Sequence, residues 1–193
     1  DTAEWGELPR HATTAEPPDA AWKGSDDASF RWGAAYDDEY LYLAIRTRDD
    51  HVALNPKAFP WDQDGVEFRI DARPDPGRSQ GRAAEDFTDN LVILVAPSPT
   101  DDGAQLLFSA DQLPSGTRVA SVALADGVAA EVAIPRRWLD DQQKTDWSAV
   151  RINACMHDHD TTAAGARGRH LFWRPDWRSE RSVEGSGTFE RER

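Results

Sequence analysis

Residues 64–71 read Asp-Gly-Val-Glu-Phe-Arg-Ile-Asp and repeat their chemistry at every second position. The apolar side chains Val66, Phe68 and Ile70 point to one side of an extended chain, and the charged residues between them point to the other. The stretch therefore predicts a β-strand with one face in a hydrophobic core and one polar face outside it.

The same alternation recurs along most of the chain and predicts a protein built from short strands. Further strands are expected at residues 30–36, 41–47, 90–96, 105–109, 119–125, 128–134, 150–157, 170–175 and 187–190. Asp126–Gly127 is a strong two-residue turn signal and predicts a hairpin, whereas residues 136–140 are expected to form one helical turn at most. Many short strands without a helix-length periodic segment predict an all-β fold, an antiparallel β-sandwich of the jelly-roll or immunoglobulin-like kind.

The chain has 193 residues, which is the length of one ordinary domain. Residues 1–20 contain three prolines and little periodicity, so we expect them to form an arm packed on a single domain of residues 21–193. The chain opens at Asp1 without an initiator methionine or an apolar leader. We interpret this as either a removed signal peptide or a piece of a longer protein that has other domains.

Composition excludes several classes of protein. The chain has 35 acidic and 22 basic side chains, and a net charge of −13 opposes binding to nucleic acids and to anionic membranes. No stretch approaches the roughly 20 apolar residues that a membrane-spanning helix needs, so we expect no membrane insertion. The single cysteine, Cys155, excludes an internal disulfide framework.

Four segments carry a family resemblance when they are taken in order. They are Phe30–Tyr42 followed by Asp49–Asp50, Trp61–Asp71, Glu131–Leu139, and Arg151–Asp160 with Trp173 beyond it. From about Trp22 to Phe189 the chain resembles the family 9 carbohydrate-binding modules. Such modules are non-catalytic β-sandwiches that are often appended to secreted glycoside hydrolases. The resemblance implies an extracellular or periplasmic, CBM9-like protein that binds an oligo- or polysaccharide.

The resemblance also implies particular site residues. In such modules two tryptophans hold the terminal sugar of a glycan between them, and a nearby carboxylate binds its hydroxyls. Trp61 matches the first tryptophan, and Glu67 matches the carboxylate on the same stretch. Trp173 is the best match for the second tryptophan, with Trp177 as its rival.

Three further side chains are expected near the sugar. Relatives place an asparagine three positions before the second tryptophan, and this chain has His170 there, which can also donate or accept a hydrogen bond. Arg69 lies on the same side of its strand as Glu67, and Arg82 is a candidate basic contact in the following loop. A sugar has an apolar face of C–H bonds and a rim of hydroxyls, so flat rings combined with fixed polar groups suit its recognition.

A structural calcium ion is a further expectation, drawn mostly from the resemblance. Calcium prefers six to eight oxygen ligands. The acidic pair Asp49 and Asp50 is the first candidate for supplying them, and Asp158 and Asp160 form a second pair. None of these residues has the spacing of an EF-hand. The alternative is that acidic residues of this kind cap backbone amides in turns.

Two alternative functions arise from individual residues. Met156 suggests a haem-binding electron-transfer domain of a related sandwich fold, although its position in the alternation favours packing in the core. His157, His159 and His170 suggest a transition-metal site. An enzyme acting on glycans is the third alternative, but no nucleophile elbow, phosphate loop or zinc-protease motif is present. The sequence therefore favours a binding module that is not an enzyme and has no cofactor besides calcium.

Overall fold

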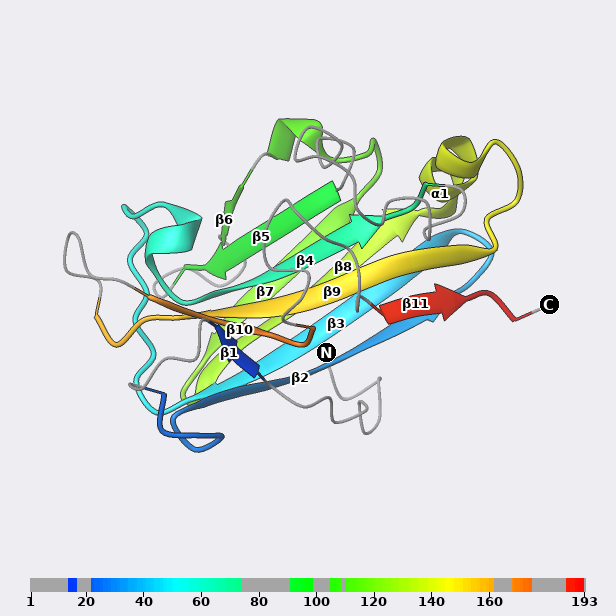
Figure 1. Ribbon diagram of the computed structural model, residues 1–193. Helices are drawn as coiled ribbons and strands as arrows, with labels where there is room; N and C mark the ends of the chain where they lie inside the picture. Colours follow the sequence, from blue (N-terminus) through cyan, green and yellow to red (C-terminus); the bar gives the residue numbers. More distant parts are fainter. Residues whose placement is uncertain are drawn as a thin grey trace.

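Two antiparallel β-sheets pack face to face in the computed structural model (Figure 1). The structure describes residues 14–16, 22–73, 91–98, 105–108, 110–161, 168–174 and 187–192. Sheet A has the order β1 (Thr14–Glu16), β10 (Arg169–Phe172), β9 (Ala149–Asp158), β4 (Gly65–Asp71), β5 (Leu91–Pro97) and β6 (Gln105–Leu107), and β11 (Gly187–Glu190) also pairs with β9. Sheet B has the order β2 (Ala28–Tyr36), β3 (Tyr40–Asp49), β8 (Gly127–Pro135) and β7 (Arg118–Leu124). This arrangement confirms the predicted antiparallel β-sandwich.

The core lies between the two sheets, where the alternating apolar side chains meet. Phe68 of β4 and Trp32 of β2 are fully buried, and their rings contact each other edge to face with centroids 6.1 Å apart. Val66 and Ile70 are buried beside Phe68, as the sequence predicts. Met156 of β9 also belongs to this core, as its place in the alternation indicates.

The short regular elements outside the sheets differ from the expectation. Helix α1 (Arg136–Gln143) is twice as long as one turn, because Leu139 and Gln143 lie four residues apart on its buried face. The Gln143 amide then donates to the carbonyl oxygens of Ala72 and Ala149 at 3.1 and 2.6 Å. Two 3₁₀ turns, η2 (Pro60–Asp62) and η5 (Ala110–Gln112), were not expected. Among the described residues, no helix has the length and apolar character needed to cross a membrane.

The N-terminal arm is described only at β1, which adds to the edge of sheet A. Thr14 pairs with Phe172 and Glu16 pairs with His170 of β10. The pairing places this part of the arm beside the strand that carries a predicted site residue.

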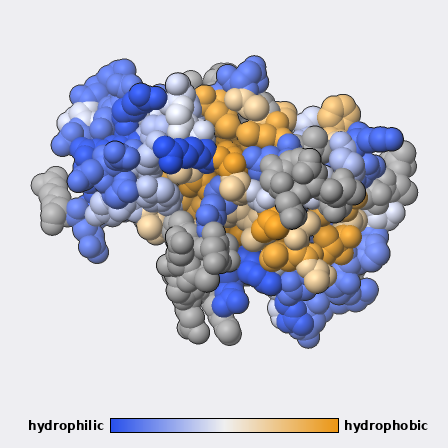
Figure 2. Space-filling model, turned by 180° about the vertical axis from the view of Figure 1, so that it is seen from behind, coloured by the Kyte–Doolittle hydropathy of each residue, from blue (hydrophilic) through white to orange (hydrophobic). Residues whose placement is uncertain are grey.

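The outer faces of the two sheets differ in character. Figure 2, which views the molecule from behind, shows apolar residues gathered between hydrophilic ends. On β7 of sheet B, Val122 is exposed, and it pairs with the small residue Ala129 of β8. Sheet A instead carries Glu67 and Arg69 on the outer face of β4, so the polar candidate site belongs to sheet A.

The hairpin between β7 and β8 turns at Ala125–Asp126, one position before the predicted pair Asp126–Gly127, and it is fixed by contacts with β3. Gly127 has a φ of 142°, a backbone conformation that side chains with a Cβ rarely adopt. A Cβ there would lie 2.5 Å from the carbonyl oxygen of Thr47. The next residue, Val128, donates its backbone N–H to Thr47 Oγ1 at 2.7 Å. Glycine is therefore required at this turn.

Gly127→Ala is expected to lower the free energy of unfolding by about 2–4 kcal/mol, from backbone strain and the clash with Thr47. Gly24→Ala is the matched control, because Gly24 also has a positive φ (103°) but its added Cβ meets no atom within 4 Å. We expect the control to cost only about 1 kcal/mol. Urea denaturation of both variants checks the difference, and equal losses would contradict the close approach of Thr47.

Candidate functional site

A buried ionic network occupies the outer face of sheet A. Glu67 of β4 accepts a hydrogen bond from Arg69 on one carboxylate oxygen, and its other oxygen lies 2.9 Å from His157 Nε2 on β9. The side chains of Glu67 and His157 are only 6% and 4% exposed. Burial alone would raise the pKa of Glu67, but His157 and Arg69 outweigh it and lower this pKa to about 2. Glu67 is therefore held as a fixed anion.

Strand β10 extends this network with two further rings. The His170 ring lies 4.3 Å from the His157 ring, and the Arg69 guanidinium lies 5.6 Å from the centre of the Phe172 ring. Partial loss of solvent around His170, together with the neighbouring His157, lowers the pKa of His170 to about 4. Within the described part of the chain, the buried Nδ1 atom of His157 has no hydrogen-bond partner. We call Glu67, Arg69, His157 and His170 the polar cluster.

Trp61 lies in η2 and belongs to an exposed group of rings. We call Phe59, Trp61 and Phe108 the aromatic platform. Phe59 stacks on Trp61 with centroids 4.8 Å apart and an interplanar angle of 3°, and Phe108 meets Trp61 at 80° with centroids 5.4 Å apart. Phe59 and Phe108 were not singled out from the sequence. The only signal for Phe59 was its place two residues before Trp61, and nothing in the sequence relates position 108 to position 61.

The aromatic platform is connected to the polar cluster through β9. His159 lies two residues beyond His157, and its Nε2 donates to the carbonyl oxygen of Trp61 at 3.2 Å. The pairing of β4 with β9 places Gly65 opposite His157, immediately after the loop that carries η2. The polar cluster and Trp61 are therefore both supported by β4 and β9.

Trp173 has a different environment from the one that the resemblance implies. It follows Phe172, so the alternation turns its side chain toward the inner side of sheet A. There its ring contacts Trp32 and Phe189, with centroids 4.9 and 6.0 Å away. The Arg174 guanidinium lies 4.6 Å from the centre of the same ring. Trp173 therefore packs against the core, whereas Glu67 lies on the outer face of the sheet.

Two residues considered for the sugar site lie outside the described part of the chain. Arg82 belongs to residues 74–90, and Trp177 belongs to residues 175–186. Their roles stay predictions.

Three buried carboxylates meet at one end of the sandwich. Asp49, Asp64 and Asp158 are 5%, 2% and 1% exposed, and each offers an oxygen within 4.8 Å of the others. Burial is the largest cause of their raised pKa values, which are about 6 for Asp49, about 8 for Asp64 and about 7 for Asp158. We call these residues the acidic triad.

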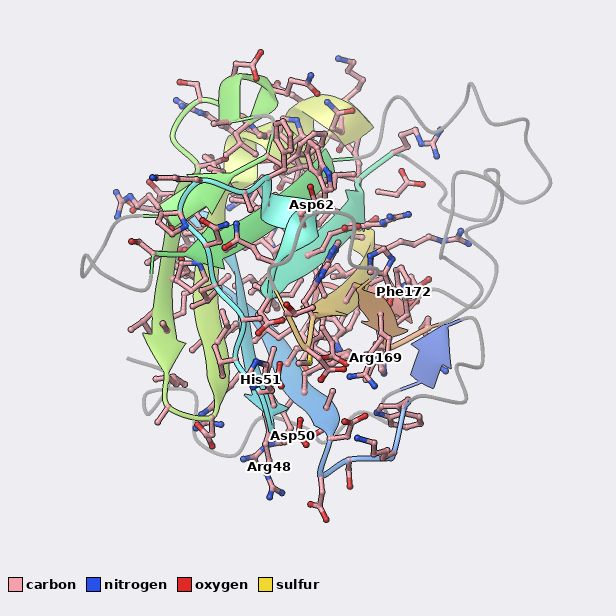
Figure 3. The ribbon with its side chains drawn as sticks, turned by 90° about the vertical axis from the view of Figure 1, so that its left-hand side faces the viewer. Arg48, Asp50, His51, Asp62, Arg169 and Phe172 are labelled. Carbon is pink, nitrogen blue, oxygen red and sulfur yellow. The ribbon has the colours of Figure 1, made fainter. Side chains whose placement is uncertain are left out.

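A second acidic group lies beside the triad and contains an arginine. Asp27, Asp50 and Asp160 bring their carboxylates within 4.8 Å of one another. Arg169 lies 3.0 Å from Asp27 and 3.2 Å from Asp160, and its Nε lies 2.7 Å from Asp158 of the triad. Figure 3 shows Arg169 and Asp50 on the same side of η2, which carries Asp62.

The predicted calcium ligands are thus divided between two groups. Asp49 and Asp158 lie together in the triad, whereas Asp50 and Asp160 lie in the group that contains Arg169. Sequence reasoning missed Asp64, because it was assigned only as the start of a strand. No spacing in the chain relates position 64 to positions 49 and 158.

Comparison with models of known protein families identifies the family of this chain. The family model described as carbohydrate family 9 binding domain-like matches residues 2–178. The chain belongs to this family. No curated protein matches it.

Solved structures share the fold at low sequence identity. A family 9 carbohydrate-binding module from Caldicellulosiruptor kristjanssonii in complex with glucose has a TM-score of 0.60 and 14% identity, over 93% of this chain and 83% of that one. The cellotriose complex of a family 9 module from the same organism has a TM-score of 0.57 and 13% identity, over 93% and 82%. A putative carbohydrate-binding protein from Bacteroides uniformis ATCC 8492 has a TM-score of 0.50 and 12% identity, over 89% and 82%.

The packing of the two tryptophans leads to opposite expectations for stability. Trp173→Ala is expected to lower the free energy of unfolding by about 3–5 kcal/mol, because it leaves a cavity beside Trp32. Trp61→Ala is expected to cost about 1 kcal/mol or less, because Trp61 is 40% exposed. Chemical denaturation of both variants measures the difference. A larger loss for Trp61→Ala would contradict the inward packing of Trp173.

Proposed function

We propose that this protein is a non-catalytic carbohydrate-binding module whose site combines the polar cluster with the aromatic platform. The observation that carries the proposal is the buried network around Glu67, which fixes a carboxylate, a guanidinium and imidazoles on one face of sheet A. Sugar hydroxyls both donate and accept hydrogen bonds, so such a mixed set of fixed groups suits them.

The exposed ring of Trp61 supplies the apolar part of the proposed site. Stacking of a pyranose on an aromatic ring buries weakly hydrated C–H groups without leaving hydroxyls unsatisfied. Stacking on one exposed ring and a few hydrogen bonds predict weak binding, micromolar or looser. The two family 9 modules of similar fold that contain glucose and cellotriose support this ligand class.

The ionisation of Glu67 argues against a role as a general acid. A general acid in a glycosidase needs a carboxyl group with a raised pKa, so that it holds a proton near neutral pH. The pKa of Glu67 is instead lowered to about 2 by His157 and Arg69 despite its burial. Glu67 can accept hydrogen bonds from hydroxyls, but it has no proton to donate.

Trp61→Ala is expected to weaken binding of cellotriose by at least about tenfold, because the stacking contact is lost. Tyr36→Ala is the matched control, since Tyr36 is an exposed aromatic residue on sheet B. We expect the Tyr36→Ala variant to bind cellotriose as tightly as the wild type does. Isothermal titration calorimetry with cellotriose, glucose and xylotriose measures both. A wild-type protein that binds none of these sugars would refute the proposed function.

We also propose that the acidic triad holds a structural calcium ion. The donors fit, because all are carboxylate oxygens and calcium takes oxygen ligands. Asp49 Oδ2 is buried and has no hydrogen-bond partner within the described residues, which is costly for a charged atom. Bound calcium would offset two of the three negative charges that the fully ionised triad carries. Asp64 accepts backbone hydrogen bonds from Ala53 and His159, so the ion would also tie the loop before β4 to the end of β9.

Removal of one triad charge tests the calcium site. Calcium is expected to raise the melting temperature of the wild type. At a calcium concentration of about 100 times Kd, the free energy of unfolding should rise by about 2.7 kcal/mol. Asp49→Asn is expected to abolish this gain and to make the calcium-free protein more stable, because repulsion within the triad falls. Asp141→Asn, an exposed position on α1, is the control and should keep the full gain. A wild type that gains no stability from calcium would remove the ion from this proposal.

A further inference from the structure

Exposed apolar side chains are concentrated at the aromatic platform. Among the described residues, the large apolar side chains that remain exposed are Tyr36, Phe59, Trp61, Phe108 and Val122. Three of these five are the rings of the platform, in which Phe59 and Phe108 each contact Trp61. A contiguous exposed apolar patch on a strongly charged protein marks a binding surface more often than a scattered residue does.

The outermost ring of the platform is Phe59. It is 62% exposed, compared with 40% for Trp61 and 38% for Phe108. Because Phe59 stacks in parallel on Trp61, it covers part of one face of the indole and presents its own opposite face outward. Phe108 stands almost perpendicular to Trp61. A ligand that approaches Trp61 on the stacked side therefore meets Phe59 first.

Buried polar groups hold Phe59 in this position. Gln63 is completely buried, and its Nε2 donates to the carbonyl oxygen of Phe59 at 3.2 Å while its Oε1 accepts from the backbone N–H of Asn55 at 2.9 Å. The backbone N–H of Asp62 donates to the same Phe59 carbonyl at 3.0 Å. The loop is thus fixed from beneath while its aromatic side chain faces outward. Such fixing lowers the entropic cost of binding.

We propose that Phe59 is a ligand-contact residue that stacks on a second sugar unit, next to the terminal sugar held at the polar cluster. This inference rests on the proposed function and adds to it that the module prefers a chain to a monosaccharide. Gln63 is then a positioning residue, which acts through the carbonyl of Phe59. The ligand unit at Phe59 is a pyranose that presents an uninterrupted face of C–H bonds.

Substitutions at Phe59 separate stacking from general apolar contact. Phe59→Leu removes the flat ring but keeps an apolar side chain, and Phe59→Tyr keeps the ring. Tyr36→Leu is the matched control, since it exchanges another exposed aromatic residue on the other sheet. Calorimetric titration of each variant with cellotriose and with glucose gives the affinity ratio of chain to monosaccharide. Thermal unfolding of each variant reports whether it is folded.

Phe59→Leu is expected to lower the affinity for cellotriose about tenfold, which corresponds to about 1.4 kcal/mol, and to change the affinity for glucose less than twofold. Phe59→Tyr and Tyr36→Leu should retain the wild-type ratio. If the wild type binds and Phe59→Leu keeps its ratio, or Phe59→Tyr loses as much as Phe59→Leu, the inference is wrong while the proposed function stands. If the wild type binds neither sugar, both are wrong.

Discussion

β4 hydrogen-bonds to β5 along one edge and to β9 along the other, so its register is fixed on both sides. A slip by one residue would turn Glu67 and Arg69 into the core and expose Phe68. The burial of Phe68 against Trp32 therefore also determines which way Glu67 points. Core packing and the placement of the polar cluster are two results of one alternating strand.

Glu67 and the acidic triad are both buried, but their pKa values shift in opposite directions. Glu67 is almost fully buried, but two cationic or hydrogen-bonding partners reach it and lower its pKa. In the acidic triad, burial and the neighbouring acids both raise the pKa values. Among the described residues, Arg169 is the cation that directly contacts the triad, at Asp158. The first group is complete as a charge network, whereas the second carries excess negative charge that a cation would balance.

The sequence sufficed for features that depend on local alternation. It predicted the two faces of residues 64–71, the central strand near residues 90–96 and the burial of Met156, because period-two patterning acts within one strand. It did not predict the triad, because Asp64 meets Asp49 and Asp158 only after distant strands have paired. The surroundings of Trp173 escaped prediction for a similar reason, since the inward face at the end of β10 is set by Trp32 and Phe189.

The place of β9 in sheet A has a consequence for how the chain folds during synthesis. β4 ends at Asp71 and β9 begins at Ala149, yet the two are hydrogen-bonded neighbours in the middle of the sheet. During synthesis, β4 therefore lacks one of its two neighbours until residues 149–158 have left the ribosome. Pairings so distant in sequence carry a large loop-closure entropy and form slowly. Nascent chains that lack β9 would present an open, apolar sheet edge, and such edges are prone to aggregation.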